Sequence, residues 1–391
     1  MPKYDFLNGN EAVAYGVKLS RPHVVSAYPI TPQTKAVEKI AQFVQDGDLE
    51  CEYMHVESEH SAMSCAIGSS SVGARTFTAT SSQGLLYMLE GLPYASGARL
   101  PIVMMNANRS IATPWNIYGD QMDAMFALPT GWIQIFVEDA QEALDMMIQS
   151  FKLAEDHEIL TPVMVNMDGF VLSHTYEKVQ IPEQKDVDDF LPEIVTAPHL
   201  MQDENPMSMC ISAGNKHNME FKIKQHKEME KAFEKFEEID LEFEKKFGRG
   251  YGSAIVGYCH EDAECLLVTA GSVTGTAKNV VDKLRKAGKK VGLLKLRMIR
   301  PFPIKLLKEL CSNNSTIGVL DKNISFGYEG SLFTNINSAL KQNNHIGETY
   351  NFIGGIGGRD ITPENIEEMF DVLLGNKKAE KISFYNMRCE L

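Results

Sequence analysis

The sequence lacks the cysteine spacing of a metal or cluster site. Its seven cysteines stand at positions 51, 65, 210, 259, 265, 311 and 389, and no two of them form a CxxC pair. Structural zinc sites and cubane iron-sulfur clusters usually need thiolates two to four residues apart, because one turn of the chain presents two ligands to one metal. We therefore expect no cluster on this chain. An odd, dispersed set of cysteines is typical of the reducing cytoplasm, where most are small buried residues.

Long hydrophobic runs and positive charge are also missing. No stretch of about 18 apolar residues occurs, and the first ten residues (MPKYDFLNGN) contain no apolar segment of a secretory signal. The 52 Asp and Glu residues outnumber 38 Lys and Arg, which gives a formal net charge of -14. Such a chain is not attracted to phosphate backbones or anionic membranes. We therefore expect a cytoplasmic protein with no nucleic-acid partner and no membrane contact.

Several familiar catalytic motifs are absent as well. The sequence contains no GxxxxGK[ST], HExxH or GxSxG, and no Gly-Asp-Gly with a distant Asn of the kind that holds magnesium diphosphate. Residues 354–358 (GGIGG) follow a predicted strand but lack the GxGxxG spacing, so they predict a flexible turn.

What is present is an ordinary globular composition in a chain of 391 residues, with 44% apolar and 23% charged residues, enough for two or three domains. Between residues 9 and 190, short apolar runs alternate with segments of helical period. Such alternation predicts an α/β fold with a doubly wound parallel sheet, whose ligands lie at the carboxyl ends of the strands. The strands are expected at 23–28, 52–56, 75–80, 101–106, 133–137 and 161–166, and the helices at 9–20, 32–45, 58–72, 83–96 and 139–156.

The remainder predicts a connection and a second, smaller α/β region. Residues 181–215 have weak periodicity, and residues 216–247 form a charged, glycine-free segment with one apolar stripe, typical of a long helix. That helix either packs on its own chain or is an arm that grips a partner subunit. We expect domains at 1–195 and 251–391, joined by 196–250. The second sheet takes strands at 264–269, 290–296, 316–320 and 349–353, with helices at 277–287, 304–310, 329–340 and 363–374.

Polar residues follow four strands of the first predicted sheet. Thr31 stands between Pro29 and Pro32, two prolines that fix the backbone around its hydroxyl. As the alternative, Thr31 is a helix N-cap in an ordinary turn. Because parallel strands end at one edge, the four loops are expected to converge there.

The other three loops also contain polar residues that could bind a ligand. Glu57 and Glu59 stand at a helix start, where they either complement the helix dipole or present a carboxylate to a ligand. Residues 80–84 (TSSQG) form a polar strand-to-helix turn. Arg109 either grips a carboxylate through paired N–H donors or is an ordinary surface arginine.

Together these motifs resemble a known family. They resemble the alpha subunit of 2-oxoacid:ferredoxin oxidoreductases, with the pyruvate enzymes as the nearest branch. The segments that carry the resemblance are residues 27–32 (AYPITP), 56–62 (VESEHSA), 73–84 (GARTFTATSSQG), 108–109 (NR) and 116–123 (NIYGDQMD). Residues 296–303 (LRMIRPFP) are similar to the transketolase C-terminal-like second domain of that family, so the resemblance covers nearly the whole chain.

The resemblance implies a thiamine diphosphate enzyme in which this chain supplies the pyrimidine-binding domain. The glutamate that bonds N1′ of the aminopyrimidine matches Glu59, and Glu57 lies two residues before it. By the same match, Thr31 and Arg109 would contact the carboxylate of the 2-oxoacid, and Pro29 and Thr31 would also line the cofactor. An arginine suits an anionic substrate because it cannot lose its proton.

The resemblance also implies partners. A beta subunit would hold the diphosphate and Mg²⁺, gamma and ferredoxin-like delta subunits would carry [4Fe-4S] clusters, and ferredoxin would accept electrons in a hetero-oligomer that is itself dimerised. The reaction would convert pyruvate and coenzyme A to acetyl-CoA and CO₂, reversibly, as part of anaerobic metabolism. A branched-chain or other 2-oxoacid is the alternative substrate. An alternative of another class is a non-catalytic doubly wound electron-transfer or scaffold subunit.

Overall fold

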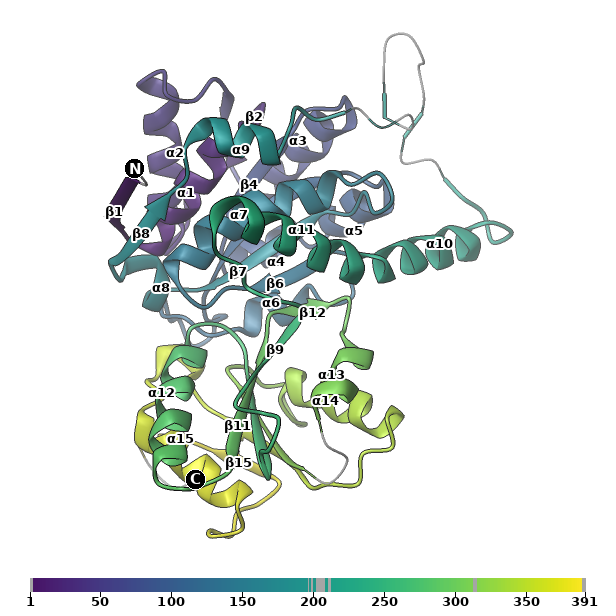
Figure 1. The fold of residues 1–391 in the computed structure, drawn as a ribbon. Helices are drawn as coiled ribbons and strands as arrows, with labels where there is room; N and C mark the ends of the chain where they lie inside the picture. Colours follow the sequence, from purple (N-terminus) through teal and green to yellow (C-terminus); the bar gives the residue numbers. More distant parts are fainter. Residues whose placement is uncertain are drawn as a thin grey trace.

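The protein is described by a computed structural model over residues 3–195, 197, 200–201, 208–209, 212–311 and 315–388. These residues form two open sheets with helices packed on both faces, and a separate two-stranded ribbon (Figure 1). The seven-stranded sheet lies in the upper half of the view and the six-stranded sheet in the lower half.

The seven-stranded sheet has the order β12-β6-β7-β5-β4-β2-β3. All strands except β12 run parallel, which confirms the predicted parallel sheet and all six of its predicted strands. Every residue of β4, β5 and β7 is buried, as expected for strands covered on both faces. The strands are β2 (Val24–Ala27), β3 (Glu52–His55), β4 (Thr76–Thr80), β5 (Ile102–Asn108), β6 (Ile133–Phe136), β7 (Val163–Asp168) and β12 (Met298–Arg300).

The five predicted helices around this sheet are found with one correction, and two short helices, at 122–126 and 171–174, were not predicted. The segment predicted as one helix over 83–96 is two helices, since Pro93 has no N–H to continue the hydrogen-bond ladder at that point. The helices are α1 (Gly9–Leu19), α2 (Thr34–Gln45), α3 (Glu59–Ser71), α4 (Gln83–Met88), α5 (Gly91–Gly97), α6 (Met122–Phe126), α7 (Ala140–Glu155) and α8 (Val171–His174).

The predicted connection contains regular structure that the sequence analysis missed. A ribbon pairs β1 (Lys3–Leu7) with β8 (Glu177–Ile181), and the helix α9 (Gln184–Phe190) follows it. Weak periodicity concealed α9 because only Val187 and Phe190 of its seven residues are buried. Part of the predicted connection, including Cys210, lies outside the described residues.

The predicted long helix is two consecutive helices, α10 (Asn218–Glu230) and α11 (Ala232–Phe247). α11 buries Phe236, Ile239 and Phe243 against its own chain, and the Phe243 ring meets the Phe190 ring edge-on at 5.3 Å. For α11, packing on its own chain is therefore confirmed. α10 has no buried residue and extends away from the body at the right of Figure 1.

The six-stranded sheet has the order β15-β14-β13-β10-β11-β9. β9 runs antiparallel to β11, whereas the other neighbours are parallel. The strands are β9 (Ile255–Tyr258), β10 (Cys265–Thr269), β11 (Val291–Leu296), β13 (Thr316–Asp321), β14 (Thr349–Ile353) and β15 (Ile382–Phe384), of which β9 and β15 were not predicted. Its helices are α12 (Val273–Lys286), α13 (Ile304–Leu310), α14 (Ser331–Gln342) and α15 (Pro363–Leu373).

One segment of the second region belongs to the first sheet. After β11 the chain crosses back, and β12 pairs with β6 in an antiparallel manner. Three residues without clear alternation gave no strand signal of their own. The two hydrophobic cores also touch, because Phe136 and Ala124 pack in one cluster with Leu296 and Ile299.

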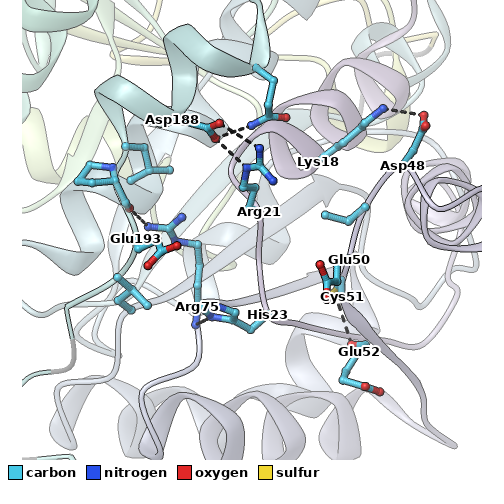
Figure 2. Close-up of a pocket in the computed structure, with 15 residues that line it drawn as sticks. Lys18, Arg21, His23, Asp48, Glu50, Cys51, Glu52, Arg75, Asp188 and Glu193 are labelled. Carbon is cyan, nitrogen blue, oxygen red and sulfur yellow. Dashed lines mark hydrogen bonds and ion pairs between the residues drawn. The ribbon is translucent and has the colours of Figure 1, made fainter.

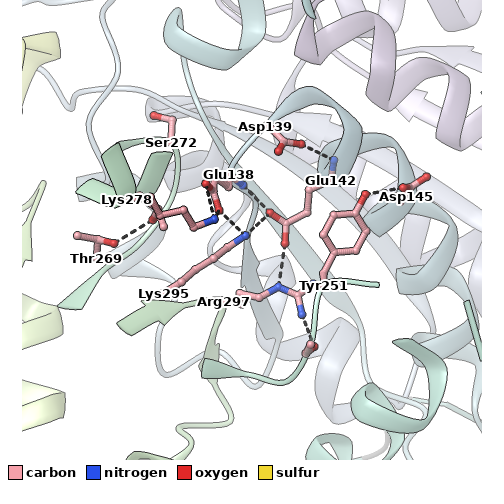
Figure 3. Close-up of polar contacts among 12 residues, drawn as sticks. Glu138, Asp139, Glu142, Asp145, Tyr251, Thr269, Ser272, Lys278, Lys295 and Arg297 are labelled. Atoms are coloured by element: carbon pink, nitrogen blue, oxygen red, sulfur yellow. Dashed lines mark hydrogen bonds and ion pairs between the residues drawn. The ribbon is translucent and has the colours of Figure 1, made fainter. Parts of the chain in front are cut away.

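Ion pairs fasten the two sheets together around Glu142 of α7 (Figure 3). Its carboxylate lies 2.7 Å from Lys295 Nζ and 2.8 Å from Arg297 Nε, both from the second region. Burial alone would raise the pKa of Glu142, but the two cations outweigh that effect and lower it to about 2. Nearby, Lys278 Nζ lies 2.8 Å from the Glu138 carboxylate. The carboxylates of α7 and its preceding loop therefore hold the second region in place.

Candidate active site

Four adjacent strands carry the polar loops that the sequence analysis singled out. In the order β3-β2-β4-β5, each strand ends at the same edge of the seven-stranded sheet. The next residues of the chain are those of the four loops, so the expectation that they lie at one edge is confirmed. Direct contacts between the loops follow from that arrangement.

Arg109 connects three of these loops. It comes directly after β5 and is only 3% exposed, so the interpretation as an ordinary surface arginine is wrong. Its Nη1 donates to the Thr31 carbonyl at 2.8 Å and its Nη2 to Gln83 Oε1 at 2.9 Å. The third nitrogen, Nε, is buried without a hydrogen-bond partner among the described residues.

The electrostatic surroundings keep Arg109 charged. Burial lowers the pKa of its guanidinium, while the negative charges of Asp123 and Glu59 oppose that effect. An arginine starts so far above neutral pH that it stays protonated. On its exposed side the guanidinium lies under the Trp115 ring, 5.4 Å from the ring centroid.

Thr31 is exposed, and its backbone is held from within. The helix α2 begins at Thr34 with Gln33 as its N-cap residue, so the alternative that Thr31 caps this helix is wrong. Gln33 Nε2 instead donates to the Tyr28 carbonyl at 2.8 Å, which fixes the loop from below. The side chains of Thr31 and Pro29 thus remain at the surface of the edge.

The two glutamates after β3 lie in different environments. Glu57 is exposed and accepts a hydrogen bond from Ser61 Oγ at 2.5 Å, which lowers its pKa. Glu59 is only 7% exposed, and no described residue donates a hydrogen bond to its carboxylate. The N-cap of α3 is Ser58, whose hydroxyl accepts from the Ser61 N–H at 3.2 Å. Helix capping therefore does not require Glu59.

Gly84 explains how Glu59 comes close to the turn after β4. A Cβ at residue 84 would lie 2.5 Å from Thr80 Oγ1 and 2.6 Å from Glu59 Oε1, distances that no real side chain tolerates. Glycine here allows the carboxylate to lie directly against the turn. The Thr80 hydroxyl is itself buried without a hydrogen-bond partner in the described part of the chain.

Three residues of this edge were not predicted as site residues. Gln83 bonds to Arg109, Trp115 covers it, and the fully buried Asp123 accepts the Arg109 backbone N–H at 3.1 Å. All three lie within or beside the segments quoted for the family resemblance. The available signal was the clustering of polar residues in those segments, but their contacts are made across the sheet and could not be derived from the sequence.

The second region reaches this edge through its glycine turn. The Gly357 N–H donates to Asp120 Oδ2 at 2.9 Å, and Asn116 Nδ2 donates to the Gly357 carbonyl at 2.9 Å. Lys322 Nζ lies 3.0 Å from Asp168 at the end of β7. The turn predicted at 354–358 therefore anchors the loop that carries Trp115.

A cavity of about 970 Å³ lies at the opposite edge, near the amino ends of β2, β3 and β4 (Figure 2). Two ion pairs lie in it, Lys18 with Asp48 and Arg21 with Asp188, each at 2.7 Å. It contains none of the four loops, so it is not the site described above.

Among the residues that the structure describes, no three His, Cys, Asp or Glu side chains gather in a way that could hold a metal ion. Within the same residues, no helix is long and apolar enough to span a membrane. Of the cysteines that the structure describes, Cys265 is buried and Cys51, Cys65, Cys259 and Cys311 are partly buried.

Comparisons with known proteins show the family of this chain. The family described as pyruvate flavodoxin/ferredoxin oxidoreductase, thiamine diphosphate-binding, matches residues 15–241, and the pyruvate:ferredoxin oxidoreductase core domain II matches residues 263–366. The pyruvate synthase subunit PorA of Methanothermobacter thermautotrophicus is 48% identical over 93% of both chains. The ketoisovalerate oxidoreductase subunit VorA of Pyrococcus abyssi is 42% identical over 98% of this chain and 97% of that protein.

Solved structures show the same fold. A 2-oxoglutarate:ferredoxin oxidoreductase from Magnetococcus marinus, with 2-oxoglutarate, coenzyme A and succinyl-CoA bound, matches 94% of this chain with a TM-score of 0.73 at 20% identity. The present chain spans 65% of the length of that one. A split-gene transketolase matches 96% of this chain with a TM-score of 0.54 at 14% identity, which agrees with the predicted fold class.

Proposed function

The chain belongs to the pyruvate:ferredoxin oxidoreductase family, and from that premise we propose that it is the alpha subunit of a multi-subunit pyruvate:ferredoxin oxidoreductase. The enzyme oxidatively decarboxylates pyruvate with coenzyme A to acetyl-CoA and CO₂, passes the electrons to ferredoxin and also runs in reverse. The observation that carries the proposal is the identity of 42–48% to PorA subunits over most of the chain.

Thiamine diphosphate fits the carboxyl edge of the first sheet. When bound, it supplies the thiazolium carbanion and the electron sink for decarboxylation. Glu59 presents a nearly buried carboxylate without a hydrogen bond from any described residue, and Gly84 leaves room beside it. A carboxylate in this state accepts a hydrogen bond from N1′ of the aminopyrimidine and holds the proton there. The neighbouring Glu57 is engaged by Ser61, which favours Glu59 for this role.

The substrate carboxylate is assigned to Arg109 and Thr31. The buried guanidinium is fixed by two hydrogen bonds and keeps an unused N–H, so it can bind an anion with little loss of side-chain entropy. The Thr31 hydroxyl, on a loop restricted by prolines, supplies a second donor. Pro29 and Thr31 line the cofactor from the same loop. The base of the loop is held by Gln33 and Arg109.

The remaining parts of the reaction are assigned to partners. A beta subunit holds the diphosphate and Mg²⁺, since this sequence has no motif for either. Gamma and delta subunits carry the [4Fe-4S] clusters, for which this sequence has no CxxC pair. Coenzyme A captures the acyl group within that assembly, which is cytoplasmic. Together the subunits form a hetero-oligomer.

A second substrate is supported by one observation. VorA subunits are 42–43% identical to this chain, almost as similar as the PorA subunits, so a branched-chain 2-oxoacid is the alternative. None of the relatives named above supports the non-catalytic electron-transfer or scaffold alternative.

The pyruvate assignment is tested by the turnover of the purified complex with pyruvate, 2-oxoisovalerate and 2-oxoglutarate. Turnover is measured as ferredoxin reduction with coenzyme A present. We expect the highest kcat/KM with pyruvate. A preference for either bulkier acid would overturn the pyruvate assignment while leaving the family unchanged, and indifference to added thiamine diphosphate would overturn the proposed chemistry.

A further inference from the structure

A buried carboxylate lies beneath the ligand-facing loops of the first sheet. Asp123, in the short helix α6, is 0% exposed and forms no ion pair with any described residue. Its Oδ2 accepts the backbone N–H groups of Ser82 at 3.0 Å and Arg109 at 3.1 Å. Its Oδ1 accepts Asn108 Nδ2 at 2.9 Å and the Ala124 N–H at 2.8 Å. One side chain thus joins the turn after β4 to the loop after β5.

The turn held in this way has a strained backbone. Ser82 has φ of 53° and ψ of -124°, a conformation that a residue with a Cβ adopts at a cost of about 1–3 kcal/mol. The Asp123 bond and a bond from Ser82 Oγ to the Ser110 carbonyl stabilise it. Because Ser82 takes this conformation, Gln83 reaches the Arg109 guanidinium and Gly84 lies against Glu59.

The four hydrogen bonds to the Asp123 carboxylate come from neutral donors, and its charge also acts on the Arg109 guanidinium without forming an ion pair. Burial raises the pKa of the Asp123 carboxyl to about 6, and the hydrogen bonds from Asn108, Ser82 and Arg109 oppose that rise. An unpaired buried carboxylate is unfavourable for stability. Both oxygens already accept two hydrogen bonds each and the side chain has no exposed surface, so Asp123 cannot touch a ligand itself.

We propose that Asp123 is a positioning residue, which fixes Arg109 relative to the Ser82–Gly84 turn so that the guanidinium faces the substrate carboxylate while the Glu59 carboxylate faces the cofactor. The proposal rests on the proposed function for the identity of these two ligands. Loss of Asp123 acceptor capacity releases both loops at once, and the distance between the anion-binding group and Glu59 is then no longer fixed.

The second sheet offers a matched control. Asp321 is also 0% exposed, and its two oxygens accept the N–H groups of Leu332 and Phe333 and the side-chain amides of Asn323 and Asn351, at 2.8 to 3.1 Å. Burial raises the pKa of its carboxyl to about 7. Asp321 therefore accepts four hydrogen bonds, two on each oxygen, as Asp123 does, but it bonds to none of the four loops.

The test compares Asp123→Asn with Asp321→Asn in the purified complex. An asparagine turns its own N–H groups toward two of the donors, so both variants lose stability by a similar amount. We expect Asp123→Asn alone to raise the KM for pyruvate about 10-fold or more and to weaken thiamine diphosphate binding in calorimetry by a similar factor. Equal KM and binding constants in the two variants would overturn the proposal.

A milder pair keeps the test decisive if Asp123→Asn does not fold. Asn108→Ala removes one donor from Asp123, and Asn351→Ala removes the equivalent donor from Asp321. We expect a rise of about 3-fold in KM for Asn108→Ala and none for Asn351→Ala. An unchanged KM in Asn108→Ala would contradict the proposed role.

A readout independent of turnover separates this proposal from the proposed function. The chain has two tryptophans, of which Trp132 is fully buried and Trp115 is 72% exposed above Arg109. Acrylamide quenching of the full chain therefore reports Trp115. We expect altered quenching in Asp123→Asn but not in Asp321→Asn, even if the complex turns over no 2-oxoacid; identical quenching in both would count against positioning of Arg109.

Discussion

The two sheets of this protein carry buried acids with the same bonding and different surroundings. At the first sheet, the donors to Asp123 come from loops that also carry Arg109 and the turn beside Glu59. At the second, the donors to Asp321 come from the start of α14 and from Asn323 and Asn351. A buried carboxylate with four hydrogen bonds therefore stabilises a helix start in the second sheet and joins two loops of the candidate site in the first.

Buried polar atoms sharpen the contrast. At the carboxyl edge of the first sheet, three polar atoms are buried without a hydrogen-bond partner among the described residues. They are Thr80 Oγ1, Gln83 Nε2 and Arg109 Nε. Leaving such groups unpaired is unfavourable, and a protein tolerates it where a ligand can bond to them. At the end of β13, in contrast, the described residues that bond to Asp321 leave no buried side-chain nitrogen or oxygen without a partner. The candidate site therefore has unpaired polar groups that the surroundings of Asp321 lack.

The largest expected effect concerns Glu59. Glu59→Gln removes the carboxylate that would hold the N1′ proton, so we expect kcat of the assembled complex to fall roughly 10²- to 10⁴-fold. The matched change Glu57→Gln, at an exposed residue two positions away, should leave kcat close to that of the wild type. Stopped-flow or steady-state ferredoxin reduction measures both. Near-normal turnover of Glu59→Gln would mean that the candidate site at the first sheet depends on Glu59 no more than the second sheet does.

The next effect concerns the ion pairs that join the two sheets. Glu142 has a pKa lowered to about 2 in the folded protein against 4.5 as its ordinary value. Its contribution to stability is therefore present above pH 4.5 and is lost as the pH falls toward 2, by about 3 kcal/mol in total. Urea unfolding between pH 2 and 7 measures it.

The control for this prediction is Glu142→Gln. It leaves Lys295 and Arg297 buried without their shared partner, so we expect it to be about 3–5 kcal/mol less stable at pH 7 and less sensitive to acid. If the free energy of unfolding fell with decreasing pH by the same amount in Glu142→Gln and in the wild type, this junction would not depend on the ionisation of Glu142.

A third prediction compares arginines near the two edges. Arg109→Lys keeps the charge but loses the forked donor set, so we expect the KM for pyruvate to rise roughly 10- to 100-fold. Arg359, an exposed residue after β14 whose guanidinium donates to the Asn386 carbonyl, is the control. Arg359→Lys should leave KM unchanged in steady-state assays. Similar KM values for both variants would exclude Arg109 from substrate binding.

The smallest expected effect compares two glycines. In Gly84→Ala the new Cβ would meet Glu59 and Thr80, so we expect thiamine diphosphate to bind a few-fold more weakly, as measured by calorimetry on the complex. In Gly330→Ala the new Cβ would meet Asp321, so we expect a lower melting temperature with unchanged cofactor affinity. If Gly84→Ala lowered only the melting temperature and left cofactor affinity unchanged, Gly84 would serve packing alone, as Gly330 does.

Much of the fold could be predicted because its strands are short apolar runs between helical segments. The six parallel strands of the first sheet and the four predicted strands of the second are confirmed. β1, β8, β9, β12 and β15 were missed. Each has three to five residues and pairs with a single neighbouring strand, and none stood in the regular alternation of strands and helices that revealed β3. α9 was missed for a similar reason.

The sequence by itself determined the family and the loops that carry polar residues, because strand ends and motifs are local properties of the chain. Burial of Glu59 beside Gly84, the hydrogen bonds of Arg109 and the link through Asp123 were decided only by the tertiary structure. These contacts join residues 14 to 78 positions apart. Their geometry follows from the strand order of the sheet, which no local pattern specifies.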